Sequence, residues 1–209
     1  MGRILLSDVA YDRIKELLLN GDFNESISEG ELVKMLNMSR TPIREALKRL
    51  TNEDFIKVYP NRGIFIKEVS IKETNDLLDL RLALETFTIE HIADKFTDED
   101  LAFLEKNAEE QMQVRIQGDA FRSVQLDLEY HKYFFKILGN DHFIKVFNHL
   151  TDRLYLHGLK RTRKRGLTNI QSIKEHIGIN KALKERDFKK ARALLEEHII
   201  LGKENYFQN

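Results

Sequence analysis

The chain has 209 residues, of which 42% are hydrophobic and 33% are charged, and 34 basic residues balance 34 acidic ones. This composition is typical of a globular protein and excludes a largely disordered chain, while the balanced charge neither favours nor excludes binding to nucleic acid. Cysteine is absent, which excludes disulfides and thiolate metal sites. No apolar run is long enough for a membrane span or a signal peptide, so we expect a cytoplasmic protein.

The first part of the chain combines three predicted helices with a predicted β-hairpin. Apolar residues at helical spacing predict a first helix ending near Asn20, and the run Ser28-Glu29-Gly30-Glu31 is a capping box that begins a second helix. Ser39 is expected to cap a third helix, whose first turn tolerates Pro42. Two β-rich runs follow, on either side of a loop that contains a glycine: residues 55–59 and 64–69. This order is that of a winged helix-turn-helix.

The third helix lies in the part of the chain with a positive local charge. Between Ser39 and Lys67 there are seven basic and three acidic residues. Helical periodicity places Arg40, Thr41 and Arg44 on the side away from the apolar residues. The N-terminal residues of a recognition helix enter the major groove, where arginine reads guanine and threonine contacts phosphate or a thymine methyl group. We therefore predict that the two arginines read bases.

The tip of the hairpin offers a second contact with DNA. Arg62, next to Gly63, is placed where a wing enters a minor groove or touches a phosphate. Lys48, Arg49 and Lys57 are expected to contact the DNA backbone at most. An exposed helix in so charged a chain also carries arginines without any such role, and the charges alone leave that alternative open.

A longer motif favours DNA binding. The run from Ser39 to Leu47, S-R-T-P-I-R-E-A-L, together with Arg62-Gly63, resembles the recognition helix and wing tip of the GntR family of bacterial transcription regulators. The resemblance implies a winged helix that binds double-stranded DNA through six residues: Arg40, Thr41, Arg44, Arg49, Arg62 and Gly63. Many relatives carry an arginine in the second helix where this chain has Gly30, so that part of the family's readout is not expected here.

From Ser70 onward the apolar period is helical, beginning with a second capping box, Ser70-Ile71-Lys72-Glu73. Six helices are predicted, at about 70–95, 98–117, 119–138, 141–164, 169–186 and 188–206. The predicted fold is therefore mainly α: a winged helix-turn-helix of three helices and a β-hairpin, followed by an all-α antiparallel bundle of about six helices. We place the two domains at residues 1–69 and 70–209.

Four polar residues interrupt the apolar faces of this bundle. Asp127 and His131 are four residues apart and face the same way, and His176 and His198 each lie among apolar residues of a later helix. A carboxylate and three neutral imidazoles suit a divalent ion such as Zn²⁺, Ni²⁺, Mn²⁺ or Fe²⁺. An inward histidine is more often a hydrogen-bonded core residue, but a buried carboxylate calls for a cation or several donors. The remaining four histidines are interpreted as ordinary: His91, His142, His149 and His157.

The second half resembles the FCD effector domain of FadR-type GntR regulators, in the run Asp127-Leu128-Glu129-Tyr130-His131, in Glu175-His176 and in Glu197-His198. The resemblance implies a metal held by four residues: Asp127, His131, His176 and His198. It also implies a small organic acid bound beside the metal, with Arg81 and Asn140 as candidate contacts. Arg81 is equally an ordinary i,i+4 partner of Glu85, and Asn140 is equally a helix-stop residue.

The resulting hypothesis is a homodimeric repressor that binds a pseudo-palindromic operator and is released by its ligand. Two alternatives are weighed against it. A metal-dependent hydrolase would use the same Asp/His₃ site but needs a general base, and no spare carboxylate is recognised near the four ligands. A regulator could also use the metal as a structural ion or as the signal itself.

Overall fold

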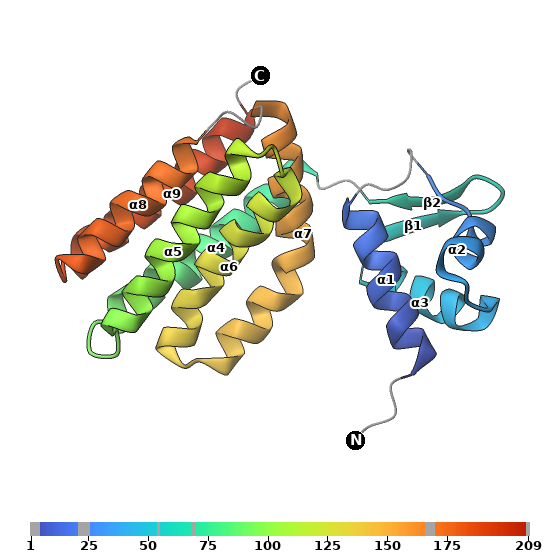
Figure 1. The fold of residues 1–209 in the computed structure, drawn as a ribbon, viewed down its shortest axis with the longest axis horizontal. Coiled ribbons are helices and arrows are strands. Elements are labelled where there is room, and N and C mark those ends of the chain that lie inside the picture. The colour runs from blue at the N-terminus through green and yellow to red at the C-terminus, as the bar shows by residue number, and fades with distance from the viewer. Residues whose placement is uncertain (1–4, 21–25, 54, 68–69, 166–169, 208–209) are drawn as a thin grey trace. The chain divides into compact units, whose positions relative to one another are not determined.

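The structure is a computed structural model that describes residues 5–20, 26–53, 55–67, 70–165 and 170–207. The chain separates into two compact units, Met1–Glu68 and Val69–Asn209, which are described one at a time (Figure 1). Within the described residues, no helix is both long and apolar enough to cross a membrane. The mainly α architecture predicted from the sequence, a winged helix-turn-helix and an all-α domain, is confirmed.

The first unit has the order of a winged helix-turn-helix. Its helices are α1 (Leu6–Asn20), α2 (Glu29–Leu36) and α3 (Arg40–Asn52), followed by strands β1 (Ile56–Tyr59) and β2 (Gly63–Ile66). The strands pair antiparallel, with Ile56 opposite Ile66, and the outer edge of β2 bonds to the backbone of Ile27. Apolar side chains from every element form the core, including Ile14, Leu32, Ile43, Leu50, Phe55 and Ile64.

The helix-turn-helix itself is fixed by local bonds around α2. The Ser28 hydroxyl accepts from the Glu31 amide at 3.2 Å and the Glu31 carboxylate accepts from the Ser28 amide at 2.8 Å, which completes the predicted capping box. Asn37 ends the helix in the left-handed conformation, with φ 51°. The prediction for α3 was wrong in one respect: Ser39 occupies the N-cap position, but its exposed side chain makes no capping hydrogen bond.

The second unit is a bundle of six helices within the described residues. They are α4 (Ile71–His91), α5 (Asp98–Ile116), α6 (Ala120–Leu138), α7 (Asp141–Arg165), α8 (Gln171–Lys184) and α9 (Phe188–Phe207). α4 packs on α9, α6 packs on α5 and α7, and α8 packs on α5 and α9. Tyr130 and Phe134 of α6 are fully buried at the centre, among apolar residues of α4, α5, α8 and α9.

Two predicted features at the ends of α4 differ from the structure. The helix ends at His91, short of residue 95, with Ile92 as its C-cap, and a capping box between Thr97 and Asp100 begins α5. At the other end Ser70 accepts from the Glu73 amide at 3.1 Å, as a cap should. The Glu73 carboxylate, however, binds the guanidinium of Arg153 on α7 at 2.5 and 2.8 Å, so the predicted reciprocal box is replaced by a bond between helices.

Candidate metal centre and DNA-binding surface

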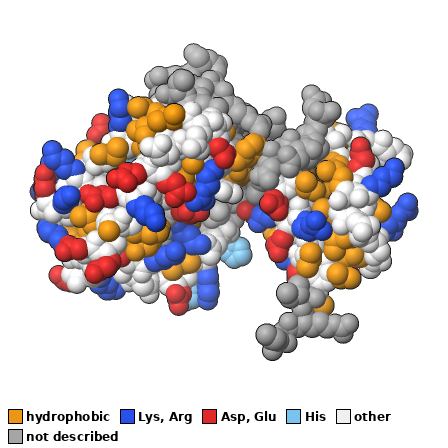
Figure 2. All heavy atoms as spheres, in the orientation of Figure 1, with side chains coloured by type: hydrophobic (Ala, Val, Ile, Leu, Met, Phe, Trp, Pro, Cys, Tyr) orange, Lys and Arg blue, Asp and Glu red, His pale blue; other side chains and the backbone are white. Residues whose placement is uncertain are grey.

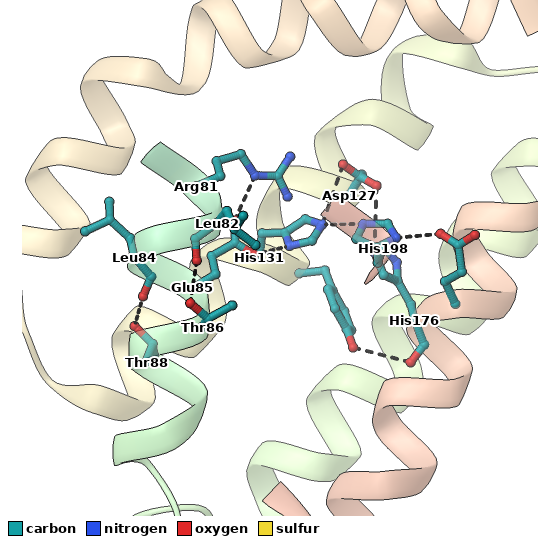
Figure 3. A network of polar contacts seen from close by, with 12 residues as sticks. Arg81, Leu82, Leu84, Glu85, Thr86, Thr88, Asp127, His131, His176 and His198 are labelled. Atoms are coloured by element: carbon teal, nitrogen blue, oxygen red, sulfur yellow. Dashed lines mark hydrogen bonds and ion pairs between the residues drawn. The ribbon is translucent and has the colours of Figure 1, made fainter. Parts of the chain in front are cut away.

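Four side chains from three helices of the second unit converge inside the bundle. Asp127 and His131 come from α6, one helical turn apart, while His176 comes from α8 and His198 from α9 (Figure 3). One ligand atom from each residue lies within 4.8 Å of the others. Ligands bound to one ion at about 2.0–2.2 Å stand at most about 4.4 Å apart, so a slight contraction brings all four onto a single ion.

The individual distances are those of a nearly formed ligand set. The Nε2 atoms of His131 and His198 are 3.3 Å apart. The two carboxylate oxygens of Asp127 point at different rings, at 4.0 Å from His131 Nε2 and at 3.9 Å from His176 Nε2. All three histidines are buried and Asp127 is half-buried. The structure therefore brings together the four residues that the sequence singled out as a ligand set.

Two carboxylates outside the ligand set hold the imidazole rings. Glu85 of α4 accepts from His131 Nδ1 at 2.6 Å (Figure 3). Glu175 of α8 accepts from His198 Nδ1 at 2.7 Å. Carboxylates of this kind orient metal-bound histidines and make them better ligands, because they fix which ring nitrogen carries the proton.

This arrangement favours a positive charge at the centre. Nδ1 of both His131 and His198 contacts a carboxylate, so the two Nε2 atoms are directed at each other across 3.3 Å. Lone pairs on both Nε2 atoms would repel each other beside the Asp127 carboxylate, and a metal ion or a shared proton between them relieves that repulsion. The donor set of three imidazoles and one carboxylate fits a borderline divalent ion.

His176 completes the case for a cation. Both of its ring nitrogens are buried and have no hydrogen-bond partner within the described chain. Its ring stacks on Tyr130, with ring centroids 4.0 Å apart, and the Tyr130 hydroxyl donates to Asn180 Oδ1 at 2.8 Å. Apart from the 3.9 Å contact with Asp127, the ring is held by packing, and a buried imidazole without a hydrogen bond costs free energy which coordination to an ion would offset.

Burial controls the charges around the centre. It lowers the pKa of His131, with a further contribution from Arg81, and it lowers the pKa of His176 well below the ordinary value, so both rings are neutral. Burial alone would raise the pKa of Glu85, but Arg81 and then His131 outweigh it and bring that pKa to about 2. Glu85 is therefore ionised, and the imidazoles of His131 and His176 are in the form that binds metals.

Arg81 lies beside this centre. Its Nε donates to Glu85 at 2.8 Å, which is the i,i+4 pair expected from the sequence, and its buried Nη2 group has no hydrogen-bond partner among the described residues. A small cavity of about 20 Å³ is lined by Arg81, Asp127 and His198, with Leu154 and Gly158 of α7 on its wall. That volume holds about one water molecule.

Asn140, the other candidate effector contact, is not brought to this centre. Its Oδ1 accepts from the amides of His142 and Phe143 at 3.0 and 3.2 Å, so the side chain caps α7. It follows His131 by nine residues along α6 and its turn, which is about 13 Å at 1.5 Å per helical residue. The interpretation of Asn140 as a helix-end residue accounts for both of these hydrogen bonds.

Two further sequence interpretations can be checked in the bundle. The expectation that His176 lies among apolar residues needs one correction, because the adjacent Ile177 is 49% exposed and the inward face of α8 continues through Ile179, Asn180 and Leu183. His91, His142 and His149 are exposed and belong to no metal-binding group among the described residues, and the side chain of His157 lies outside what the structure describes.

The first unit presents the predicted recognition helix to solvent. Pro42, Ile43, Ala46 and Leu47 of α3 are buried, whereas its predicted DNA contacts are exposed: Arg40, Thr41, Arg44 and Arg49. Lys and Arg side chains are visible on the surface of this unit, mixed with hydrophobic ones (Figure 2). The helix therefore has one face in the core and a polar, mainly basic face available to a partner.

Each of the three arginines has an acidic neighbour, and two of them, Arg44 and Arg49, make hydrogen bonds to it. Arg44 Nε donates to both carboxylate oxygens of Glu29 at 3.0 and 2.9 Å, and this contact raises the pKa of the Arg44 guanidinium. Arg49 binds Asp8 of α1 at 2.6 Å and stacks on the ring of Tyr11 at 4.2 Å. Arg49 is thus engaged with α1, and its predicted contact with the DNA backbone stays a prediction.

The wing tip shows why a glycine follows Arg62. Arg62 is exposed in the turn between the strands, and Gly63 has φ +106°, which residues with a side chain rarely adopt. A Cβ at Gly63 would also lie 3.2 Å from the Ile27 carbonyl oxygen. The glycine is needed for the close approach of three backbone segments, and Arg62 remains the candidate for the DNA contact.

Sequence reasoning missed Glu85 and Glu175 as parts of the metal centre. Glu85 was considered only as the partner of Arg81, and Glu175 only as a neighbour of His176, and no carboxylate was expected near the ligands. The available signal was helical spacing, which puts Arg81 and Glu85 on the same face of the helix as the apolar residues Leu78 and Ile89. Both carboxylates are engaged with histidine Nδ1 atoms, so neither is placed as a free general base.

Comparisons with known proteins cover both units. Residues 6–66 match the family described as "Bacterial regulatory proteins, gntR family", and residues 76–201 match the FCD domain. The Nta operon transcriptional regulator of Aminobacter aminovorans is 30% identical over 178 residues, which cover 84% of this chain and 81% of that protein. The HTH-type transcriptional repressor NanR of Klebsiella aerogenes is 26% identical over 222 residues, covering 95% and 84%.

A solved structure shares the fold. The crystal structure of a putative transcriptional regulator GntR from Rhodococcus sp. RHA1 superposes with a TM-score of 0.81 at 16% identity, over 95% of each chain. At this identity the likeness concerns the fold, in which a winged helix precedes an all-helical domain.

Proposed function

Because the chain belongs to the GntR family of bacterial regulatory proteins and carries an FCD domain, we propose that it is a homodimeric repressor whose operator affinity is set by a small carboxylate bound at a divalent metal ion. The coarser part of this statement is established: the chain is a DNA-binding transcriptional regulator and not an enzyme, so the hydrolase alternative falls. The finer part is supported by one observation above all: Asp127, His131, His176 and His198 converge, and the Nε2 atoms of His131 and His198 lie 3.3 Å apart.

The metal gives the site its preference for an acid. Four protein ligands leave two positions free on a six-coordinate ion, and an oxygen of a carboxylate ligand suits those positions. The unpartnered Nη2 group of Arg81 lies on the same cavity wall as Asp127 and His198, and a guanidinium is the side chain best suited to hold a carboxylate. We therefore assign Arg81 to the effector and leave Asn140 out of the site.

Ligand entry requires the bundle to open. A cavity of about 20 Å³ is too small for any organic acid, so binding displaces one of its walls. Leu154 and Gly158 of α7 form part of that wall, and the adjacent Arg153 is bonded to Glu73 in the first turn of α4, the helix that follows the winged-helix unit in sequence. A shift of α7 thus provides a route from the ligand to the start of the effector domain. Couplings of about 1–3 kcal/mol give a 5- to 150-fold change in operator affinity.

The proposed dimer has a candidate surface on α4. Leu80, Ala83 and Phe87 are exposed on this helix and follow one another at helical spacing, which makes an exposed apolar stripe, with one face of the Phe87 ring stacked on His91. Two recognition helices in a symmetric dimer would meet half-sites about one helical turn of DNA apart. Repression, rather than activation, follows the printed name of the NanR relative and is part of the proposal.

The experiment is a ligand screen read out by DNA binding. The purified full chain is loaded with Zn²⁺, Ni²⁺ or Mn²⁺, or stripped with a chelator, and small carboxylic acids are screened for a rise in melting temperature. Active acids are then added to the chain bound to a duplex selected from a random library. We expect at least one acid that stabilises only the metal-loaded protein and releases the duplex. Release by metal alone, with no response to any acid, would instead make the metal itself the signal.

A further inference from the structure

The side chain of Glu29 stands between the two arginines of the proposed DNA-reading surface. It is the first residue of α2, yet its carboxylate reaches across to α3, where both oxygens accept from Arg44 Nε. The Nε of Arg40 is 4.0 Å from the same carboxylate. An acidic group so close to a surface meant for DNA opposes phosphate binding, so its position calls for a separate explanation.

The backbone around Glu29 is firmly held. The capping box between Ser28 and Glu31 fixes the first turn of α2, and the left-handed Asn37 fixes its other end. Glu29 therefore projects from a rigid point, whereas Arg44, whose side chain is 62% exposed, would otherwise sample many rotamers. Fixing one end of a long flexible side chain reduces the entropy lost when its other end binds.

The atom of Arg44 that binds Glu29 matters for the recognition of a base. A guanidinium has five N–H donors, and the contact with Glu29 occupies Nε of Arg44, while its two terminal Nη groups make no hydrogen bond to the described residues. Those two groups form the fork that bonds O6 and N7 of guanine. The geometry points to Glu29 as a positioning residue that presents Arg44 end-on to a base and lowers binding to non-specific DNA by its charge. This inference rests on the proposed role of Arg44 as a base-reading residue.

The test compares specific and non-specific binding for a small set of full-length variants. The probes are the duplex selected by the wild-type protein, a scrambled duplex, and versions of the selected duplex with each guanine replaced. Glu29→Ala removes both the charge and the contact. Glu29→Gln removes the charge but keeps an oxygen that can accept from Nε. Glu45→Gln removes an exposed negative charge from α3 itself, so it is the matched control for electrostatics.

We expect Glu29→Ala to bind the scrambled duplex more tightly and to discriminate less well at one guanine. The loss of discrimination should be about 5-fold or more and should not exceed the roughly 150-fold that a complete bidentate contact can supply. Glu29→Gln should gain non-specific affinity but keep most of the discrimination, and Glu45→Gln should keep all of it. Adding Glu29→Ala to an Arg44→Ala chain should cost no further discrimination, because the positioned group is gone.

Three results would overturn the inference. Equal strengthening of specific and non-specific binding in Glu29→Ala would leave charge repulsion as the whole effect. Equal weakening of both, with a lower melting temperature, would make Glu29 a structural residue of α2. Unchanged discrimination in Glu29→Ala, where Arg44→Ala does lose it, would refute the positioning role alone. If Arg44→Ala itself binds the selected duplex as well as the wild type, the base-reading proposal fails instead.

Discussion

At the scale of single residues, the metal centre depends on a chain of buried charges. Arg81 neutralises Glu85, Glu85 fixes the ring of His131, and His131 faces His198 across the proposed ion. Each group is buried, so each depends on its neighbour for compensation. A buried ion pair adds little stability by itself, but removing one partner leaves the other charge unpaired.

We therefore expect Arg81→Met to be strongly destabilising. Loss of the guanidinium leaves the Glu85 carboxylate buried with only His131 beside it, and the free energy of unfolding should fall by about 3–5 kcal/mol. The double variant Arg81→Met/Glu85→Gln removes the charge as well and should recover much of that loss. Urea denaturation of the metal-free chains measures both. A double variant no more stable than Arg81→Met would show that packing, not charge, sets the cost.

The sequence indicated the four ligands but not the residues that orient them. Asp127 and His131 are recognisable because one helical turn separates them, and a histidine or carboxylate on an apolar face stands out. The contact of Glu85 with His131 and that of Glu175 with His198 join residues 46 and 23 positions apart. Such contacts depend on which helices pack together, and no local pattern carries that information.

At the scale of the elements, helix types and most boundaries followed from local signals, while their exceptions followed from contacts between helices. Glu73 could not be predicted to leave its capping box, because its partner Arg153 is 80 positions away. Asn140 is placed by the turn it caps rather than by the ligand site. The glycines also divide into those required by a local backbone conformation and those required by contact with a neighbouring helix.

Gly158 is predicted to set the closeness of α6 and α7. A Cβ at this position would lie 2.7 Å from Val124 Cγ1, so Gly158→Ala forces the helices apart and should cost about 1–3 kcal/mol. Gly178 on α8 is the matched control, because a Cβ there has nothing within 4 Å. Gly178→Ala should be neutral or stabilise the helix by up to about 1 kcal/mol. Thermal denaturation compares the two. Equal melting temperatures would contradict the tight contact.

The two residues at the wing tip should separate folding from DNA binding. Gly63→Ala puts a side chain at φ +106° and 3.2 Å from the Ile27 carbonyl oxygen, and we expect a loss of about 1–3 kcal/mol in stability. Arg62→Ala should leave stability unchanged and weaken binding to the selected duplex, with a smaller dependence of affinity on salt. Circular dichroism melts and salt titrations of DNA binding distinguish these effects. Weaker DNA binding for Gly63→Ala at unchanged stability would contradict the conformational role.

At the scale of the whole molecule, the DNA-binding part and the proposed metal centre belong to different units of one chain. The first unit matches a family of DNA-binding regulators, and the candidate ligands of the second come from three helices, so an ion at that centre would tie α6, α8 and α9 together. The fold of both units could be predicted because helical and strand periodicities are local properties. The size of the cavity, and hence the need for α7 to move, could be obtained only from the packed structure.

The central claim is that Asp127, His131, His176 and His198 hold one divalent ion. The most direct measurement is elemental analysis of the purified full chain after dialysis, compared with His176→Ala and with His149→Ala, an exposed histidine of α7. The account predicts one ion per chain in the wild type and in His149→Ala, and none retained in His176→Ala. Stoichiometric metal in His176→Ala, or a wild type that retains no ion after loading with any of the candidate metals, would contradict it.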